Sequence, residues 1–385
     1  MGILSGMTIT EHGAFIAGPF STLSLAKLGA NVIRIDPIGG GIDYRRWPIS
    51  ADGHSLYWSG LNKGKKSIAI DLRRPEGQDL AQTLITAPGD GAGLFVTNFP
   101  AIGWLDYETL RSLRQDLIMA TVLGNYDGST AVDYTVNCAV GFPLATGPED
   151  MSEPINHVLP AWDLLCGQTV AMALLAAERY RRVHGHGQLF RVALSDVALA
   201  AVSDLGMISE VEINGSGRSK QGNQIYGAYG CDFATKDGRR VMVAAVSRSQ
   251  WRALCKATEA DARVREMEDR EGCDLNDEGE RFRHREAITA LLTPWFGDRS
   301  LAQIGALLDR ARVCWGVYQT FEQMVAEDPR CSMQNPMFES VNHNGIGLSL
   351  TARSPIQFSR LDIAGNRPLL AVLSHGGMGL MMPTC

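Results

Sequence analysis

The residue with the clearest chemical potential in this chain is Asp163, which stands at the start of a long apolar stretch. Pro160 and Asp163 precede an uncharged run from Leu164 to Ala177. A carboxylate at the start of a helix either caps the backbone N–H groups or remains available as a nucleophile toward an acyl carbon. The residue type alone favours the cap, because aspartate is a preferred residue at helix starts. Both interpretations stay open at this level.

The same stretch predicts a helix whose charges match its dipole. Asp163 lies at its head, Arg179, Arg181 and Arg182 lie near its end, and glycines follow at 185 and 187. Acidic residues are favourable at the N-terminus of a helix and basic residues at its C-terminus. Because the middle of the run is uncharged, we expect this helix to be buried nearly all round.

Basic residues at two places form a candidate anion site. Arg45 and Arg46 follow one predicted strand, and Lys63, Lys65 and Lys66 follow Asn62. These side chains could line a pocket for an anionic ligand, and a solvated surface cluster fits the pattern equally well. The glycines at 39–41 and the loop 214–222 lack the spacing of phosphate-binding loops, so plain turns are favoured there.

The elements that must position these residues alternate between strands and helices in the N-terminal half. Such alternation builds a doubly wound parallel sheet covered by helices, an α/β fold. The predicted strands are Met7–Glu11, Asn31–Asp36, Lys65–Asp71, Gly93–Asn98 and Leu117–Val122, and the predicted helices between them are Phe20–Leu28, Glu76–Ile85 and Leu105–Arg114.

Bulk properties exclude several classes of function. A chain of 385 residues is too long for one core, so two domains are expected. The net charge of −6 argues against a nucleic-acid or membrane-surface binder. Eight scattered cysteines without a C-x-x-C pair indicate neither a disulfide framework nor a metal site. The start of the chain lacks a signal-peptide pattern and no apolar run is long enough to span a membrane, so we expect a cytoplasmic protein.

Five segments, taken in order, resemble the class III CoA-transferase family. They are AGP at Ala17–Pro19, LAKLGANVIRIDP at Leu25–Pro37, LNKGKKSIAIDL at Leu61–Leu72, TNFP at Thr97–Pro100, and the Asp163 segment that ends in LLAAERYRRVHGHGQ at Gln188. Each segment alone is modest, and the five in this order are specific. The resemblance extends from about residue 6 to 358.

The resemblance implies that Asp163 is the catalytic nucleophile and that a coenzyme A thioester is the substrate, with no permanently bound cofactor. It implies a CoA site formed by three segments: Phe15 and Ile16, then Leu61, Asn62 and Lys65, then Asn98 and Phe99. Contacts to the phosphates are expected from Arg45, Arg46 or the lysines. Some relatives place basic residues after the Asn-Phe pair and at a strand end. This chain has Pro100–Gly103 and Leu123 at these places. The end of the chain, Ser359–Cys385, also departs from the family pattern.

Within the family, four phrases resemble the members that move CoA between the two carboxyl groups of one mesaconate molecule. They are Ile35–Pro48, Gly60–Asp71, Asn156–Asp163 and Gln221–Phe233. The implied reaction passes through an aspartyl anhydride and an aspartyl-CoA thioester. Three alternatives stay open: an intermolecular transferase with a succinyl-CoA donor, a catalytically impaired CoA-binding protein and, more distantly, a nicotinamide-dependent dehydrogenase.

The resemblance also implies the architecture. We expect a large Rossmann-like domain from residues 1–224 and 327–385, and a smaller α+β domain from residues 225–326. Two such chains are expected to form an interlaced homodimer. The expected binding partner is a small acyl-CoA, with neither nucleic acid nor membrane.

Overall fold

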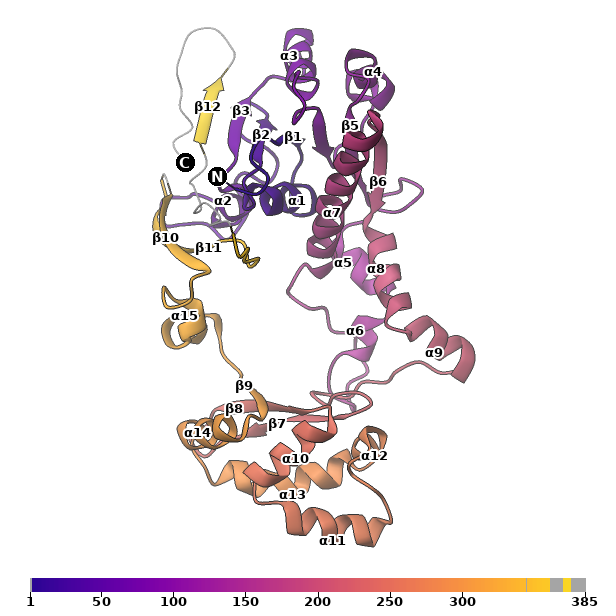
Figure 1. Ribbon diagram of the computed structural model, residues 1–385, viewed down its shortest axis with the longest axis vertical. Coiled ribbons are helices and arrows are strands. Elements are labelled where there is room, and N and C mark those ends of the chain that lie inside the picture. The colour runs from indigo at the N-terminus through magenta and orange to yellow at the C-terminus, as the bar shows by residue number, and fades with distance from the viewer. Residues whose placement is uncertain (1, 344, 361–369, 375–385) are drawn as a thin grey trace. The chain divides into compact units, whose positions relative to one another are not determined.

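The computed structural model describes residues 2–343, 345–360 and 370–374 (Figure 1). The chain divides into two compact units. One unit contains residues 1–140, 156–215 and 329–385, and the other contains 141–155 and 216–328. The segments 141–155 and 216–224 and residues 327–328, all expected in the large domain, thus belong to the second unit. Hydrogen bonds join these two segments: the backbone N of Gly222 donates to the O of Gly147 at 2.9 Å, and Lys220 donates to the O of Glu153.

The first unit is built on a parallel sheet with the strand order β12-β3-β2-β1-β4-β5-β6. The six strands from β3 to β6 have the Rossmann order, so the predicted α/β fold with a parallel sheet is confirmed. The strands are β1 (Thr8–His12), β2 (Asn31–Asp36), β3 (Lys66–Ala69), β4 (Leu94–Thr97), β5 (Ile118–Leu123), β6 (Leu189–Ala193) and β12 (Leu370–Ser374).

Helices cover both faces of this sheet (Figure 1). Successive strand residues point to opposite faces, and in β1 the Thr10 hydroxyl donates to Leu84 of α3 while Glu11 accepts from Thr22 of α1. Helices α1 and α3 therefore lie on opposite faces. The helices of this unit are α1 (Ala17–Ala26), α2 (Leu56–Asn62), α3 (Pro75–Ile85), α4 (Tyr107–Leu113), α5 (Asp133–Ala139), α7 (Ala161–His184), α8 (Leu194–Asp204) and α9 (Met207–Asn214). Short 3₁₀ turns lie at Gly103–Leu105, before α4, and at Pro329–Cys331. Strand β10 (Phe338–His343) pairs antiparallel with β11 (Gly347–Ala352).

Helix α7 begins and ends close to where its sequence predicts. It ends at Gly185, which adopts a left-handed φ of 75° that glycine tolerates best. Gly167 lets α7 approach α1 closely, because a Cβ there would lie 2.9 Å from the carbonyl oxygen of Ala17. The expectation of burial all round is wrong for the single chain. One stripe of α7 is buried, while the opposite side exposes Met172 and Val183, so the lack of charge alone did not define its surroundings.

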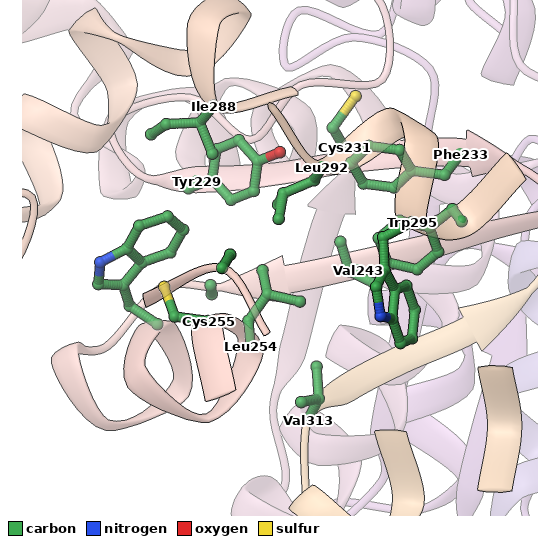
Figure 2. Packing of buried hydrophobic residues seen from close by; sticks show 14 of the residues in the cluster. Tyr229, Cys231, Phe233, Val243, Leu254, Cys255, Ile288, Leu292, Trp295 and Val313 are labelled. Atoms are coloured by element: carbon green, nitrogen blue, oxygen red, sulfur yellow. The ribbon is translucent and has the colours of Figure 1, made fainter. Parts of the chain in front are cut away.

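The second unit has a three-stranded antiparallel sheet, β7-β8-β9, packed against helices. Its core is apolar and aromatic, with Phe233 and Phe296 stacked at 4.2 Å between ring centroids. Figure 2 shows Tyr229, Leu254 and Ile288 within the same cluster. The elements are α6 (Phe142–Ala145), β7 (Tyr229–Ala234), β8 (Arg240–Ala245), α10 (Arg248–Ala257), α11 (Asp261–Glu271), α12 (Glu278–Arg283), α13 (Arg285–Gly297), α14 (Leu301–Ala311), β9 (Cys314–Val317) and α15 (Phe321–Glu327).

Three expectations concern features spread along the whole chain. The seven cysteines in the described ranges are all free thiols. Among the described helices, none has both the length and the apolar character needed to cross a bilayer. Within the atypical segment 359–385, β12 pairs in parallel with β3. The remainder of that segment from residue 361 onward lies outside the described residues.

Candidate active site

The predicted CoA-binding segments meet where the direction of the sheet's connections reverses. Strands β1 and β4 are neighbours, and ligands of open α/β sheets bind beyond the carboxyl ends of such a pair. Asn98, just after β4, holds the turn after β1: its Oδ1 accepts from the N of Ala14 at 2.9 Å, and its Nδ2 donates to the O of Ala14 at 2.8 Å. Phe99 packs against His12 with 4.7 Å between ring centroids. These segments thus lie against one another at the carboxyl end of the sheet.

Phe15 and Ile16 occupy the turn itself. Phe15 has a left-handed φ of 63°, which is unfavourable for a bulky residue, and its ring is partly exposed. Its backbone N donates to Oδ2 of the buried Asp43 at 2.7 Å, and this bond holds the strained turn. Ile16 follows as a buried residue before α1. Phe15 is therefore partly exposed at the turn, while Ile16 is buried beneath it.

Lys65 and Asn62 lie in a buried charge network beneath this surface, together with Glu11 and Arg34. The Lys65 ammonium donates to Glu11 at 2.8 Å, to the carbonyl of Pro19 at 2.8 Å and to Asn62 at 2.9 Å. All three of its N–H donors are thus used, and its side chain is fully buried. Lys65 and Asn62, both expected at the CoA site, are thus buried and hydrogen-bonded within the protein. Leu61, beside them in α2, is half-buried.

Arg46 is exposed and lies between two aromatic rings. Its guanidinium carbon is 5.6 Å from the ring centroid of Phe15 and 5.3 Å from that of Tyr57. Both distances are in the range of cation–π attraction, which orients the side chain without neutralising it. The charge of Arg46 also acts on Asp163, where it lowers the pKa. Arg46 therefore links the Phe15 turn with the start of α7.

Asp163 is the third residue of α7, and its carboxylate does not cap the helix. Within the described part of the chain it accepts no hydrogen bond, and the helix begins without a side-chain cap from its own flanking residue. The capping interpretation favoured by the residue type is therefore wrong. The pKa of Asp163 is raised to about 7, mainly by burial and then by the charge of Asp133, while the charge of Arg46 lowers it. A desolvated carboxylate without hydrogen bonds keeps its lone pairs available for attack.

Asp133 at the start of α5 supplies the cap instead. Its Oδ2 accepts from the backbone N of Trp162 at 2.8 Å and from that of Asp163 at 3.0 Å. One helical turn later, Asn137 Oδ1 accepts from the indole N–H of Trp162 at 3.0 Å and contacts Nε2 of His157 at 2.9 Å. Two residues of α5 thereby fix both the first turn of α7 and the loop before it.

Two cavities flank the segment after β4. The smaller, of about 90 Å³, lies between His12, Asp36, Ile42 and Phe99. The larger, of about 180 Å³, is lined by Ala101, Tyr107, Leu123 and Arg191 among others. Some relatives have basic residues near the positions of Ala101 and Leu123, which are uncharged here. Arg191 of β6 lines the same cavity and provides a positive charge there. Sequence patterns gave no indication of it.

One group of described side chains has donor atoms close enough together to hold a metal ion. Cys273, Glu280 and His284 of the second unit have ligand atoms within 4.8 Å of one another. Glu280 is already paired with Arg283, and it lies 3.6 Å from His284. The group is therefore accounted for as a surface ion-pair cluster.

Sequence reasoning missed Asp43, Tyr57 and Asp133. Asp43 and Asp133 accept hydrogen bonds from residues at least 28 positions away in the chain. Tyr57 contacts Arg46, which lies 11 positions away. No periodic pattern marks such partners. Asp133 opens the short helix α5, and its place in the sequence does not reveal that its carboxylate caps α7.

A Rossmann-like sheet with this turn and a desolvated aspartate at a nearby helix start is the arrangement expected for a CoA-transferase. The chain matches the model of CoA-transferase family III over residues 4–370 and belongs to that family. It is 53% identical over 359 residues to the 2-methylfumaryl-CoA isomerase of Chloroflexus aurantiacus, covering 93% of this chain and 88% of that protein. It is also 26% identical over 407 residues to the succinyl-CoA:mesaconate CoA-transferase of Haloarcula hispanica, covering 98% of each.

Solved structures show the same fold. A CAIB/BAIF family protein from Brucella suis superposes with a TM-score of 0.76 at 24% identity, over 96% of both chains. The family predicted from the five sequence segments is thus confirmed, and the protein is an enzyme of the class III CoA-transferases.

Proposed function

We propose that this enzyme moves CoA between the two carboxyl groups of mesaconate, with Asp163 as the nucleophile. The 53% identity to a 2-methylfumaryl-CoA isomerase over most of both chains is the observation that carries the proposal. 2-Methylfumarate is another name for mesaconate, so that relative's name describes the same acyl group. The desolvated, unbonded Asp163 carboxylate provides the chemistry that the transfer needs.

The first half of the reaction transfers the acyl group and then CoA to the enzyme. The ionised Asp163 carboxylate attacks the thioester carbonyl at carbon one, and the C–S bond breaks to give a mixed anhydride and CoA thiolate. The thiolate then attacks the aspartyl carbonyl of the anhydride. This step releases free mesaconate and leaves an enzyme-bound aspartyl-CoA thioester.

The second half reverses these steps at the other end of mesaconate. The carboxylate of carbon four attacks the aspartyl thioester, which forms the second anhydride and frees the CoA thiolate again. Attack of the thiolate on carbon four yields the isomeric thioester and restores the Asp163 carboxylate. No proton or electron is gained or lost, so the cycle needs no permanently bound cofactor.

The proposal assigns distinct roles to the residues of the binding surface. Phe15 and Phe99 contact CoA, and Asn98 holds the turn against which CoA lies. Arg46, which faces Asp163, pairs with the carboxylate of the dicarboxylic substrate that is not joined to CoA. Lys65 and Asn62 act from below by anchoring this surface.

The experiment that tests the proposal is an isotope-exclusion assay. The enzyme is incubated with unlabelled mesaconyl-C1-CoA and an excess of ¹³C-labelled free mesaconate. The proposal predicts mesaconyl-C4-CoA without label, because mesaconate is retained while it presents its second carboxylate. Incorporation of label into the product would show that the bound acid exchanges with free mesaconate. If product forms only when free acid is added, intramolecular transfer is contradicted.

A second candidate is intermolecular transfer from succinyl-CoA to a dicarboxylic acid. The full-length similarity to a succinyl-CoA:mesaconate CoA-transferase favours it. The same assay with succinyl-CoA in place of mesaconyl-CoA separates the two candidates. Product formed only from succinyl-CoA and free acid would establish the intermolecular reaction, and binding without any turnover would identify an impaired CoA-binding protein.

We also propose that the protein is a homodimer located in the cytoplasm. Apolar side chains exposed along α7, α8 and α9 support association between copies of the chain: Met172, Leu199, Leu205, Val211 and Ile213. Light scattering of the purified protein would test this, and a monomer at micromolar concentration would contradict it.

A further inference from the structure

The carboxylate that caps α7 has an unusual environment for a purely structural cap. Asp133 is 3% exposed, and its Oδ2 accepts both backbone hydrogen bonds at the start of α7. Its other oxygen, Oδ1, is buried without a hydrogen-bond partner among the residues that the structure describes. A buried charged oxygen that lacks a partner costs stability, and serine or threonine would cap a helix without that cost.

The neighbouring contacts make Asp133 part of a rigid support for Asp163. Asn137, on the same face of α5, binds the Trp162 indole, His157 and Asn156. Since Oδ1 of Asn137 can only accept, Nε2 of His157 donates to it. The loop before α7 and the first turn of α7 are thus both fixed by α5, through one charged and one neutral side chain.

We propose that Asp133 is a positioning residue for the reaction: it fixes the backbone that carries Asp163, and it places a second buried negative charge beside the nucleophile. The proposal rests on the proposed function, in which the Asp163 carboxylate attacks the acyl carbon. Asn137 completes the support without adding charge. A neutral cap would hold the helix equally well and would lack the second effect.

The charge has a chemical consequence for Asp163. A carboxylate beside another carboxylate is more basic, and a more basic carboxylate is a stronger nucleophile toward a carbonyl carbon. The groups that face Asp163 are Asp133 of α5, Arg46 after β2, Tyr57 of α2 and Cys166 of α7. Burial and Asp133 raise the pKa of Asp163, and Arg46 lowers it. The charge of Asp133 therefore offsets the lowering of the Asp163 pKa by Arg46, the cation that pairs with the substrate carboxylate not joined to CoA.

Three variants separate the two effects. Asp133→Asn keeps an oxygen that can accept both backbone hydrogen bonds and removes only the charge. Asp133→Ala removes the charge and the hydrogen bonds. Asn137→Ala loosens the same contact between α5 and α7 without changing any charge, and so serves as the matched control.

The test follows the titration of Asp163 by ¹³C NMR of aspartate-labelled protein, with Asp163→Asn used to assign the signal. We expect Asp133→Asn to lower the titration midpoint of Asp163 by about one pH unit, and Asn137→Ala to leave it in place. The acidic limb of kcat/KM should move with the NMR midpoint. Asp133→Asn should also reduce kcat above pH 8 by roughly tenfold, and Asp133→Ala should reduce it further.

An unchanged midpoint in Asp133→Asn, or an equal shift in Asn137→Ala, would overturn the proposal and leave Asp133 as a structural cap. The NMR measurement needs no substrate, so it stands apart from the proposed function. If the wild-type protein forms no isomeric thioester while the Asp133→Asn shift is observed, the proposed function has failed and the influence of Asp133 on Asp163 has not.

Discussion

A Cβ atom built on Gly13 would lie 2.9 Å from Oδ1 of Asn98, so the turn after β1 and the loop after β4 approach each other as closely as the chain permits. That oxygen is the one that accepts from the backbone of Ala14. This close approach leaves room only for glycine at position 13. The two hydrogen bonds between the Asn98 amide and the backbone of Ala14 then fix the position of the Phe15 turn.

Gly13→Ala should consequently damage binding more than folding. The added methyl group displaces the Asn98 amide and with it the Phe15 turn, so we expect KM for the CoA ester to rise roughly tenfold to a hundredfold. Steady-state kinetics measure this. The control is Gly60→Ala in α2, where a Cβ meets no atom within 4 Å and no change in KM is expected. Equal effects of the two variants would refute this role of the turn.

The buried network beneath the turn should dominate the stability of the first unit. Lys65→Met leaves Glu11 buried with one cation fewer, and breaking a buried ion pair in this way costs about 3 kcal/mol of unfolding free energy. Denaturant unfolding checks the value. Arg73→Ala, which removes the exposed pair with Asp71, should leave the unfolding midpoint unchanged. A similar loss in both variants would contradict this assignment.

Arg46→Ala should affect the pH dependence of the reaction in the opposite sense to Asp133→Asn. Arg46 lowers the pKa of Asp163, so its removal raises that pKa and moves the acidic limb of kcat/KM to higher pH. The affinity for a dicarboxylic substrate should fall roughly tenfold or more. Arg46→Lys retains the charge and should keep the limb near its wild-type position. A limb that moves to lower pH in Arg46→Ala would show that Arg46 does not face Asp163.

The raised pKa of Asp163 also makes a prediction about folding. Its ordinary pKa is 3.8 and burial raises it to about 7, so between these values the native state holds a proton that the unfolded state has lost. Stability contributed by this group is therefore present at low pH and declines as pH rises through this window.

Asp163→Asn should accordingly be more stable than the wild type at pH 8, by about 4 kcal/mol, with the difference vanishing near pH 4. Thermal unfolding at the two pH values measures it. Asp116→Asn is the control of opposite sign, because a hydrogen bond from Arg114 lowers the pKa of Asp116. Loss of stability in Asp163→Asn at pH 8 would contradict the desolvated site.

Much of the fold could be predicted because local patterns determine it. Strand β2 has the predicted bounds Asn31–Asp36, and α7 lies where its acidic head and glycine stop indicate. These signals act within one element, so the sequence carries them. The family followed from five such segments in order and not from any one of them.

The site was predicted less completely, because its contacts join distant elements. Lysine is usually solvated, so its sequence position did not reveal that Lys65 is buried by Glu11, 54 residues away. The cap of α7 comes from Asp133 and not from the aspartate inside the helix. Sequence spacing could identify Asp163 as a candidate, but only the arrangement of α5 and α7 shows that its carboxylate does not cap the helix.

The most direct test of the account is to trap the covalent intermediate. The enzyme is incubated with mesaconyl-CoA alone, treated with borohydride or hydroxylamine, and mapped by peptide mass spectrometry. The account predicts that Asp163 is converted to homoserine by borohydride and to the hydroxamate by hydroxylamine, while the isomeric thioester appears. Formation of that thioester with an unmodified Asp163 would contradict it.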